Sequence, residues 1–377
     1  MNVPDRVKTG MRGRKQAQRQ FLAAIDVNAR IPQGHPLREI KRLCEEGFGR
    51  LSPRFEAMYS ELGRPSIPPE RLLGARLLMA LFSVPSERAF CERLRYDLLF
   101  QWFLDLELEE ESFDASTFSK NQQRLLEHQV ADGFFAEVVD SLRQRNLLSE
   151  EHFSVDGTLI DAWASLKSFR PKDEGDQGPK DGNGWGDFSG QSRSNDTHES
   201  RSDPQAKLLK KGEGKEAKLC YTGHAVMENR HGFCVSFELT PSVGVTEGQV
   251  ALEQLKHLAE EGFCPTSVGA DKNYHNGPFV AGCRAEGIKP HVATIKDRKV
   301  AGLDGRTTGS KGYKISQTIR KRAEQIFGWA KTVGGMRRSR YCGAERTDAA
   351  CKWVISALNL LRLAKLSVSP PEAVVRA

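Results

Sequence analysis

The chain has 377 residues, of which 38% are hydrophobic and 28% charged, an ordinary composition for a protein that buries a core. This length suits two or three domains of roughly 100–200 residues each. An excess of 56 lysines and arginines over 49 aspartates and glutamates gives a net charge of +7, which permits a polyanionic partner without requiring one.

Targeting and redox signals are absent from the sequence pattern. Residues 1–20 are polar and contain no apolar run, so we expect no secretory signal. No stretch approaches the ~18 apolar residues of a membrane span, which predicts a cytoplasmic protein with no membrane partner. None of the eight cysteines forms a C-x-x-C pair, so a structural zinc site is not expected and the thiols are expected to be reduced.

The N-terminal third divides into a basic arm and a helical region. Residues 1–34 are expected to be a flexible arm, either solvated or bound to phosphates. Residues 35–147 are expected to form a helical domain, with an apolar helix from Glu70 and a helix over 87–103 that Ser86 caps. Two further helices are expected over residues that follow the capping segment 112–117 and over about 128–145.

The first of those two helices carries Lys120 and Arg124 four residues apart, so both side chains lie on one helix face. They face either DNA phosphates or solvent, and the sequence leaves both possibilities open.

Near Phe153 the apolar period changes, and residues 148–367 are expected to form an α/β domain, followed by a tail over 368–377. Phe153–Asp156 is a short strand candidate, and the polar stretch 167–217 reads as a long loop or disordered insertion. The remaining expected elements are a β-hairpin over 218–227 and 232–240, helices over 246–261, 277–286, 314–331 and 345–366, strands over 266–270 and 288–292, and a loop over 296–312. This order predicts a mixed sheet with helices packed on its faces.

Two aspartates follow strand candidates directly. Asp156 ends the segment Phe153–Asp156, and Asp271 ends the strand expected over 266–270. An acid that leaves a strand end is well placed to face a site above the sheet, although either residue alone is also typical of a turn or a helix cap.

A third acid, Glu324, lies on the helix expected over 314–331. At ~100° per residue, Glu324 is about 40° and Lys331 about 20° around the helix from Arg320. This face presents an acid between two cations, which suits either a surface salt-bridge pattern or a functional site. Three carboxylates from separate elements suit two Mg²⁺ or Mn²⁺ ions, because these cations take oxygen ligands and bridge to phosphate.

Through these acids and their neighbours, the sequence resembles the insertion-sequence DDE transposases of bacteria, in the insertion-sequence four and five superfamily. The closing signature of that group is Tyr-x2-Arg-x3-Glu-x6-Lys, and Arg320, Glu324 and Lys331 match its last three members in spacing. Gln317 occupies the Tyr position, which is a departure. The segments around Asp156 and Asp271 resemble the blocks that hold the first and second acids, and residues 63–126 resemble the helical domain that precedes them.

The resemblance implies an RNase H-like core, with Asp156, Asp271 and Glu324 as catalytic and metal-binding acids. It also implies dependence on Mg²⁺ or Mn²⁺ and recognition of terminal inverted repeats. Such an enzyme would nick each element end and join the freed 3′-hydroxyl to target DNA. We expect a homodimer on DNA, because two ends must be held together.

Other basic residues are candidates for DNA contacts. Arg320 and Lys331 would position phosphates, and beyond the Gly334-Gly335 pair Arg337 and Arg338 form a possible phosphate track, together with Lys120 and Arg124. Two rival functions remain open at this stage: an RNase H-like nuclease or resolvase that does not transpose, and a DNA-binding repressor with a decayed catalytic core.

Overall fold

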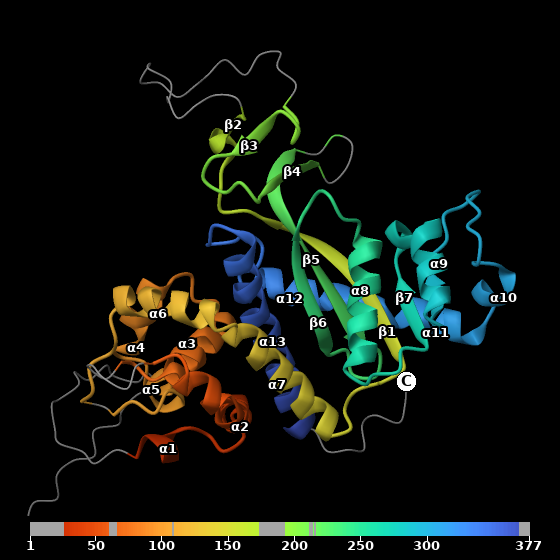
Figure 1. Cartoon of the computed structure of the whole chain (residues 1–377). Coiled ribbons are helices and arrows are strands. Elements are labelled where there is room, and N and C mark those ends of the chain that lie inside the picture. The colour runs from red at the N-terminus through yellow and green to blue at the C-terminus, as the bar shows by residue number, and fades with distance from the viewer. Residues whose placement is uncertain are drawn as a thin grey trace, which may run out of the picture.

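The structure of the chain, a computed structural model, describes residues 26–59, 66–107, 109–172, 193–210, 214 and 216–368 (Figure 1). Most of the basic arm expected over 1–34 and nearly all of the tail expected over 368–377 lie outside these residues. Within the arm, Val27–Arg30 forms a one-turn helix, α1, whose N-cap Asp26 accepts a hydrogen bond from the backbone N–H of Ala29.

Helices make up the N-terminal part of the chain, as expected. They are α2 (Pro36–Glu56), α3 (Pro69–Leu81), α4 (Glu87–Leu94), α5 (Leu98–Phe103), α6 (Ala115–Glu127) and α7 (Val130–Gln144). Ser86 caps α4 as predicted. The single helix expected over 87–103 was wrong, because the chain turns after α4 and Asp97 starts α5 by accepting from the N–H groups of Leu99 and Phe100.

A six-stranded mixed sheet forms the centre of the second part (Figure 1). Its strands are β1 (His152–Asp161), β4 (Lys207–Lys210), β5 (Ala217–Glu228), β6 (Cys234–Pro241), β7 (Ser267–Ala270) and β8 (Lys289–Val292). β5 pairs antiparallel with β1, β4 and β6, and β1, β7 and β8 are parallel. The expected hairpin is confirmed as β5 and β6. A mixed sheet flanked by helices, after a helical N-terminal region, confirms the expected RNase H-like fold class.

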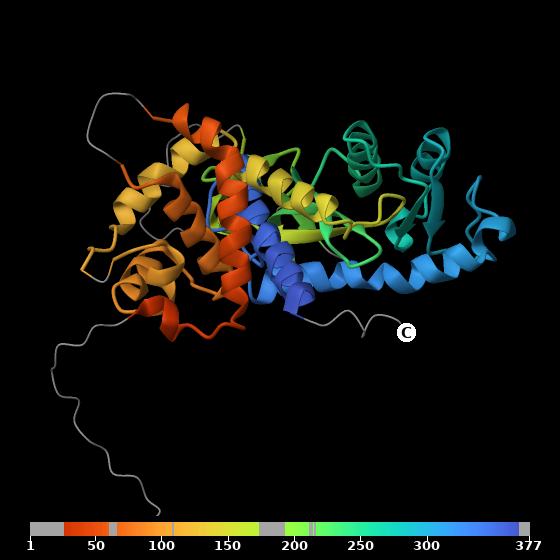
Figure 2. The same ribbon diagram turned by 90° about the horizontal axis from the view of Figure 1, so that it is seen from below.

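Helices cover both faces of this sheet (Figure 2). α8 (Glu247–Glu260) and α9 (Gly277–Ala285) lie on one side and contact each other. On the other side a long helical stretch crosses the sheet as α11 (Lys311–Ile319) and α12 (Lys321–Thr332). Arg320 joins these two helices with helical backbone angles, and its N–H still bonds to the carbonyl of Ser316. The helix expected over 314–331 therefore begins earlier, at a Ser310 cap, and the loop expected before it contains the short helix α10 (Gly305–Thr308).

The polar segment 167–217 is more ordered than the sequence indicates. Besides β4, it holds β2 (Phe169–Pro171) paired with β3 (His198–Ser200), after the 3-10 turn η1 (Leu166–Ser168). Phe169 is buried and stacks on His198, and the buried Tyr221 hydroxyl donates to Asp203 at 2.6 Å. A few anchors thus fix short strands in a segment whose average polarity predicts a loop. Residues 173–192, 211–213 and 215 lie outside the described part.

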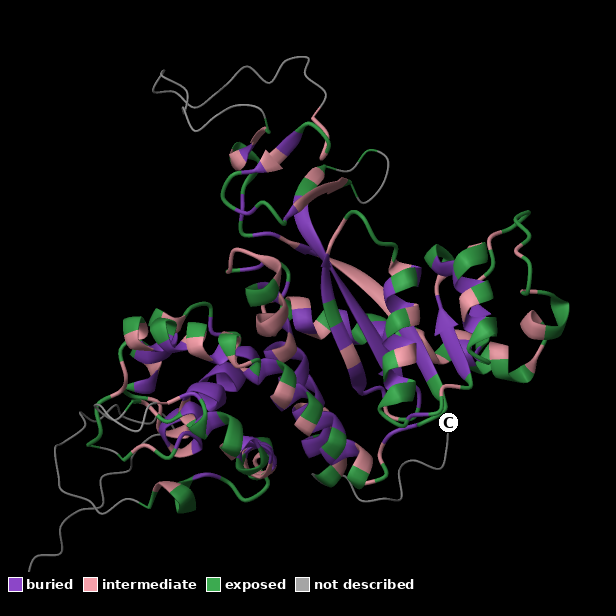
Figure 3. Cartoon of the chain, viewed as in Figure 1, coloured by how far each residue is buried: buried purple, intermediate pink, exposed green. Residues whose placement is uncertain are grey.

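The last helix, α13 (Ala344–Val368), belongs to both parts of the molecule. It packs against β6 and α12 of the sheet region and against α2, α3 and α7 of the N-terminal region. Its residues that face these neighbours are buried (Figure 3), and Trp353 contacts Phe134 with ring centroids 5.5 Å apart. Trp353 is buried and belongs to the core that the two parts share.

A buried cation adds a polar connection between the same two parts. Arg76 of α3 is 7% exposed and donates to Glu87, Gln122 and the Tyr341 hydroxyl, the last at 2.9 Å. No helix in the described part of the chain is long and apolar enough to cross a membrane. All eight cysteines are described, and all are free thiols.

Candidate active site

Asp156 lies in the middle of β1. The sequence places it at a strand end, which was wrong: β1 stays paired with β5 as far as Asp161 and Cys220. Its side chain shares a strand face with Ser154, because side chains alternate along a strand. Ser154 lies against Gly269 of β7, next to Arg320. Asp156 therefore faces the side of the sheet that α11 and α12 cross.

Asp271 follows the last residue of β7 directly, as predicted. It caps the 3-10 turn η2 (Lys272–Tyr274) by accepting a 2.8 Å hydrogen bond from the N–H of Asn273. The parallel register pairs His152 with Ser267, an offset of 115 residues, and Asp156 and Asp271 are separated by the same 115. Asp156 and Asp271 are therefore at equivalent positions two residues beyond the Ser154–Gly269 pair, and the charge of Asp271 acts on Asp156.

Glu324 lies in the first turn of α12 and is exposed. Ala323 and Ile326 on the same helix are buried against the sheet, which fixes the rotation of the helix. α12 contacts β1, so the acid of α12 and the mid-strand acid come from packed elements.

The charges of these acids act on one another. Burial, followed by the negative charge of Asp271, raises the pKa of Asp156 to about 7, and the charges of Glu247 and Glu324 add to this rise. A hydrogen bond from the N–H of Gly157, 2.9 Å from Asp156 Oδ1, opposes it. The three acids expected from the sequence therefore share one electrostatic site.

Glu247 is a fourth acid that sequence reasoning missed. It occupies the first turn of α8, after the Thr246 cap. A Cβ atom on Gly157 would lie 2.9 Å from its Cδ, so the absence of a side chain at Gly157 lets this carboxylate approach β1. The cap pattern at Thr246 and Gln249 predicts the helix start, but nothing local in the sequence predicts the approach of Glu247 to β1.

Tyr274, in the turn η2 that follows Asp271, is a buried aromatic residue close to the acids. It is 1% exposed and lies 5.1 Å from the Phe279 ring, centroid to centroid. Burial, followed by the charges of Glu247, Asp156 and Asp271, raises the pKa of the Tyr274 hydroxyl well above its ordinary value. Tyr274 therefore stays neutral beside the acids.

The carboxylates of the acids are the type of ligand that a divalent cation requires. Carboxylate oxygens are the ligands that Mg²⁺ and Mn²⁺ prefer, and a cation would offset the repulsion that raises the pKa of Asp156. Among the described residues, however, no three His, Cys, Asp or Glu side chains already converge closely enough to hold a metal ion together. In the described residues, Asp271, Glu247 and Glu324 are close enough to act on the charge of Asp156, but the carboxylates are not gathered around one point.

Gln317, at the position where the resembled family has Tyr, holds Arg320 in place. Its side-chain amide donates to the carbonyl of His291 at 2.5 Å and that of Ala270 at 3.4 Å, at the ends of β8 and β7. Its carbonyl accepts from Arg320 Nε at 2.7 Å. Gln317 therefore links Arg320 to the strand end that precedes Asp271.

The other predicted DNA contacts lie in varied settings. Lys331 is partly buried in the last turn of α12, and Arg337 is exposed. Arg338 donates to the carbonyls of Ala162 and Trp163 at 3.1 and 3.0 Å, so part of its guanidinium has a structural role.

Lys120 and Arg124 lie on α6, which packs on α4, α7 and α13. Lys120 is exposed, whereas Arg124 lies over the Tyr59 ring, 4.7 Å from its centroid. The structure does not bring these two residues together with the acids.

Two family models match separate parts of the chain. A family model described as "Transposase domain (DUF772)" matches residues 25–124, and one described as "Transposase DDE domain" matches residues 149–360. A search of curated proteins returned no match.

Two solved structures are similar at low identity. "Cryo-EM structure of piggyBac transposase synaptic complex with hairpin DNA" is 10% identical over 88% of this chain and 76% of that one, with a TM-score of 0.37. "Crystal structure of a pre-cleavage Mos1 transpososome" is 8% identical over 81% and 82%, with a TM-score of 0.18. Neither similarity is strong enough to carry an argument. The DDE model by itself spans more than half of the chain, in the region that contains all four acids, and the chain therefore belongs to the insertion-sequence DDE transposases, enzymes that cleave and transfer DNA.

Proposed function

We propose that Asp156, Asp271 and Glu324 hold two Mg²⁺ or Mn²⁺ ions and that the enzyme uses them to cut the ends of its element. One observation supports this most: two acids distant in sequence, Asp271 and Glu324, both raise the pKa of Asp156. Bound divalent ions would activate the attacking oxygen and stabilise the leaving oxygen.

The protein side chains would orient the DNA. Arg320, whose Nε donates to Gln317, is proposed to bind a phosphate of the cleaved strand through its guanidinium. Lys331, Arg337, Arg338, Lys120 and Arg124 are proposed as further backbone contacts. The helical region, residues 35–147, is proposed to bind the inverted repeats, and a homodimer to hold two ends. Its action on DNA suits a cytoplasmic location.

Two steps make up the proposed reaction. Water attacks a phosphodiester at the element end and leaves a 3′-hydroxyl; that hydroxyl then attacks a phosphodiester of the target and displaces a 3′-oxygen. Bonds broken and formed balance in each step, and no external energy source is needed.

The assay uses a duplex that carries the inverted repeat found beside the gene. With Mg²⁺ or Mn²⁺ we expect a nick with a 3′-hydroxyl and, after a target plasmid is added, joined products; with EDTA we expect neither. Nicks without joined products would indicate a nuclease that does not transpose. Binding without any nick, in either metal, would contradict the catalytic proposal.

Glu247 is proposed to position Asp156 and the metal ions from the α8 side. Gly157→Ala tests this, because the added methyl group would displace the flexible tip of Glu247 and leave the strand intact. We expect nicking to slow by roughly 3–10-fold, equivalent to about 1 kcal/mol, with little change in the melting temperature.

A double-mutant cycle supplies the control. If Gly157→Ala acts through Glu247, adding it to Glu247→Gln should slow nicking no further than Glu247→Gln alone. Fully additive losses would show that Gly157 acts by another route.

A further inference from the structure

We propose that residues 295–322, here called the 295–322 arm to distinguish them from the N-terminal arm, bind the backbone of the duplex that enters the catalytic site. This inference rests on the proposed function and adds a DNA-binding surface to it. The arm contains nine lysines and arginines and two aspartates, a net charge of +7. The whole chain also has a net charge of +7, so all the other residues together are neutral.

The part of the arm before α11 projects beyond β8, whereas α11 itself packs against β7 and β8 (Figures 1 and 2). The base of the arm is braced at several points. Arg284 of α9 donates to the Thr307 hydroxyl at 2.7 Å and the Gly302 carbonyl at 3.0 Å, and the Tyr313 hydroxyl donates to the carbonyl of Val292 at 3.0 Å. A braced arm loses little entropy when it binds a ligand.

Seven exposed cations of the arm form no ion pair with a carboxylate in the described part of the chain. They are Lys296, Arg298, Lys299, Lys311, Lys314, Lys321 and Arg322. Arg306 differs, because Asp304 pairs with it at 2.8 Å. Seven cations without acidic partners are a surface that only an external anion neutralises.

Four of these cations form one stripe along α11 and α12. At ~100° per residue, Lys311, Lys314, Lys321 and Arg322 fall within an arc of about 100°. Glu324 lies about 60° beyond the edge of the arc, on the adjoining face. The stripe therefore lies beside Glu324, one of the proposed catalytic acids, on the same helical stretch.

The length of the stripe suits duplex DNA. From Lys311 to Arg322 the helix rises about 16 Å, an axial length in which one DNA strand carries about five phosphates. Since lysines that contact phosphates do not read base edges, the arm should bind without regard to sequence.

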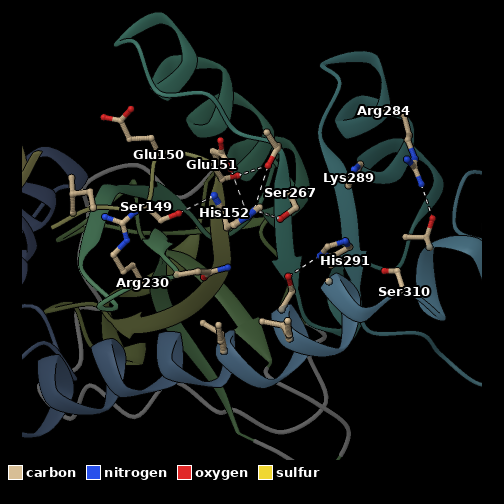
Figure 4. Close-up of a pocket in the computed structure, with 18 of the residues that line it drawn as sticks. Ser149, Glu150, Glu151, His152, Arg230, Ser267, Arg284, Lys289, His291 and Ser310 are labelled. Atoms are coloured by element: carbon tan, nitrogen blue, oxygen red, sulfur yellow. Dashed lines mark hydrogen bonds and ion pairs between the residues drawn. The ribbon is translucent and has the colours of Figure 1, made fainter. Parts of the chain in front are cut away.

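A large cavity lies between the arm and the strands β1, β7 and β8, and it is a poorer candidate for binding duplex DNA. Figure 4 shows Arg284, Lys289 and His291 on one side of it and Glu150 and Glu151 on the other. Asp304 lines it as well. A polyanion would meet both signs of charge there, whereas the stripe offers one sign.

The test measures duplex binding without divalent metal, over a range of salt concentrations. For Lys311→Gln with Lys314→Gln, we expect the slope of log affinity against log salt to fall by about 1.8, because each lost phosphate contact removes about 0.9. Affinity at 0.15 M salt should fall tenfold or more, equally for the end sequence and a random duplex.

The matched control is Lys218→Gln with Lys256→Gln, which removes two charges that already pair with carboxylates. The slope of this variant should stay within about 0.3 of the wild-type value. A second pair, Lys321→Gln with Arg322→Gln, repeats the test at the other end of the stripe. If both arm pairs bind like the control, the proposal is wrong.

Because no metal is present, this result is independent of catalysis. If the wild-type protein nicks DNA but the arm variants bind duplex as the wild type does, the proposal for the arm is wrong and the catalytic proposal stands. If the arm variants show a smaller slope of log affinity against log salt but the wild-type protein never nicks DNA, the proposal for the arm stands and the catalytic proposal is wrong.

Discussion

Asp156→Asn is expected to make the protein more stable while removing its activity. The loss of one metal-binding carboxylate should slow nicking by roughly 10³-fold or more, because metal activation of a phosphoryl oxygen contributes several kcal/mol. The gain in stability follows from the surroundings of Asp156, where burial and the charge of Asp271 disfavour the ionised carboxylate.

This gain should depend on pH. Folding raises the pKa of Asp156 from 3.8 to about 7, so ionisation destabilises the folded state relative to the unfolded one. The penalty is absent below pH 3.8, grows as the pH rises, and is complete above about 7. Asparagine cannot ionise and escapes it. We expect a metal-free advantage of about 1–3 kcal/mol at pH 8, and a smaller one at pH 5.

Melting temperatures at pH 5 and pH 8 in EDTA, with nicking assays beside them, measure both effects. Glu324→Gln is the matched comparison: its carboxylate is exposed, so nicking should be lost with no comparable gain in stability. An Asp156→Asn protein that is less stable than wild type at pH 8, or that still nicks, would contradict the account of this site.

Glu228→Ala is expected to destabilise the fold more than any surface change. Glu228 is 0% exposed, and its two carboxylate oxygens accept hydrogen bonds from four backbone N–H groups. The donors are Ser149, Arg230, His231 and Phe233, at 2.7–3.0 Å. Truncation leaves these donors without an acceptor, a loss we put at more than about 4 kcal/mol.

A milder variant keeps the test readable if the alanine protein does not fold. Glu228→Gln retains one acceptor oxygen and should fold with a melting temperature between those of wild type and Glu228→Ala. Glu238→Ala, on the paired strand and exposed, is the control and should change stability by less than about 0.5 kcal/mol. A Glu228→Ala protein as stable as this control would show that the carboxylate does not stabilise the turn between β5 and β6.

Local patterns in the sequence predicted those parts of the site that are set locally. Asp271 follows the strand predicted over residues 266–270, and Arg320, Glu324 and Lys331 lie along the predicted helix. The hairpin of β5 and β6 follows from alternation around the turn that Gly232, at φ +84°, allows.

Features set by contacts between distant segments escaped prediction. β1 runs past Asp156 because β5 pairs with it along nine residues, although the strand pattern in the sequence ends at Asp156. Two other contacts also join segments that are distant in the sequence. Glu247 approaches Gly157, and the buried Tyr221 donates a hydrogen bond to Asp203 in segment 167–217.

The sharing of α13 between the two parts limits how the enzyme can move. A swing of the N-terminal helices away from the sheet would pull apolar side chains out of one continuous interior and separate Arg76 from Tyr341. If the N-terminal helices bind the element end as proposed, the distance between that contact and the phosphodiester that is cut is fixed. Any curvature needed to fit both points must come from the double helix itself.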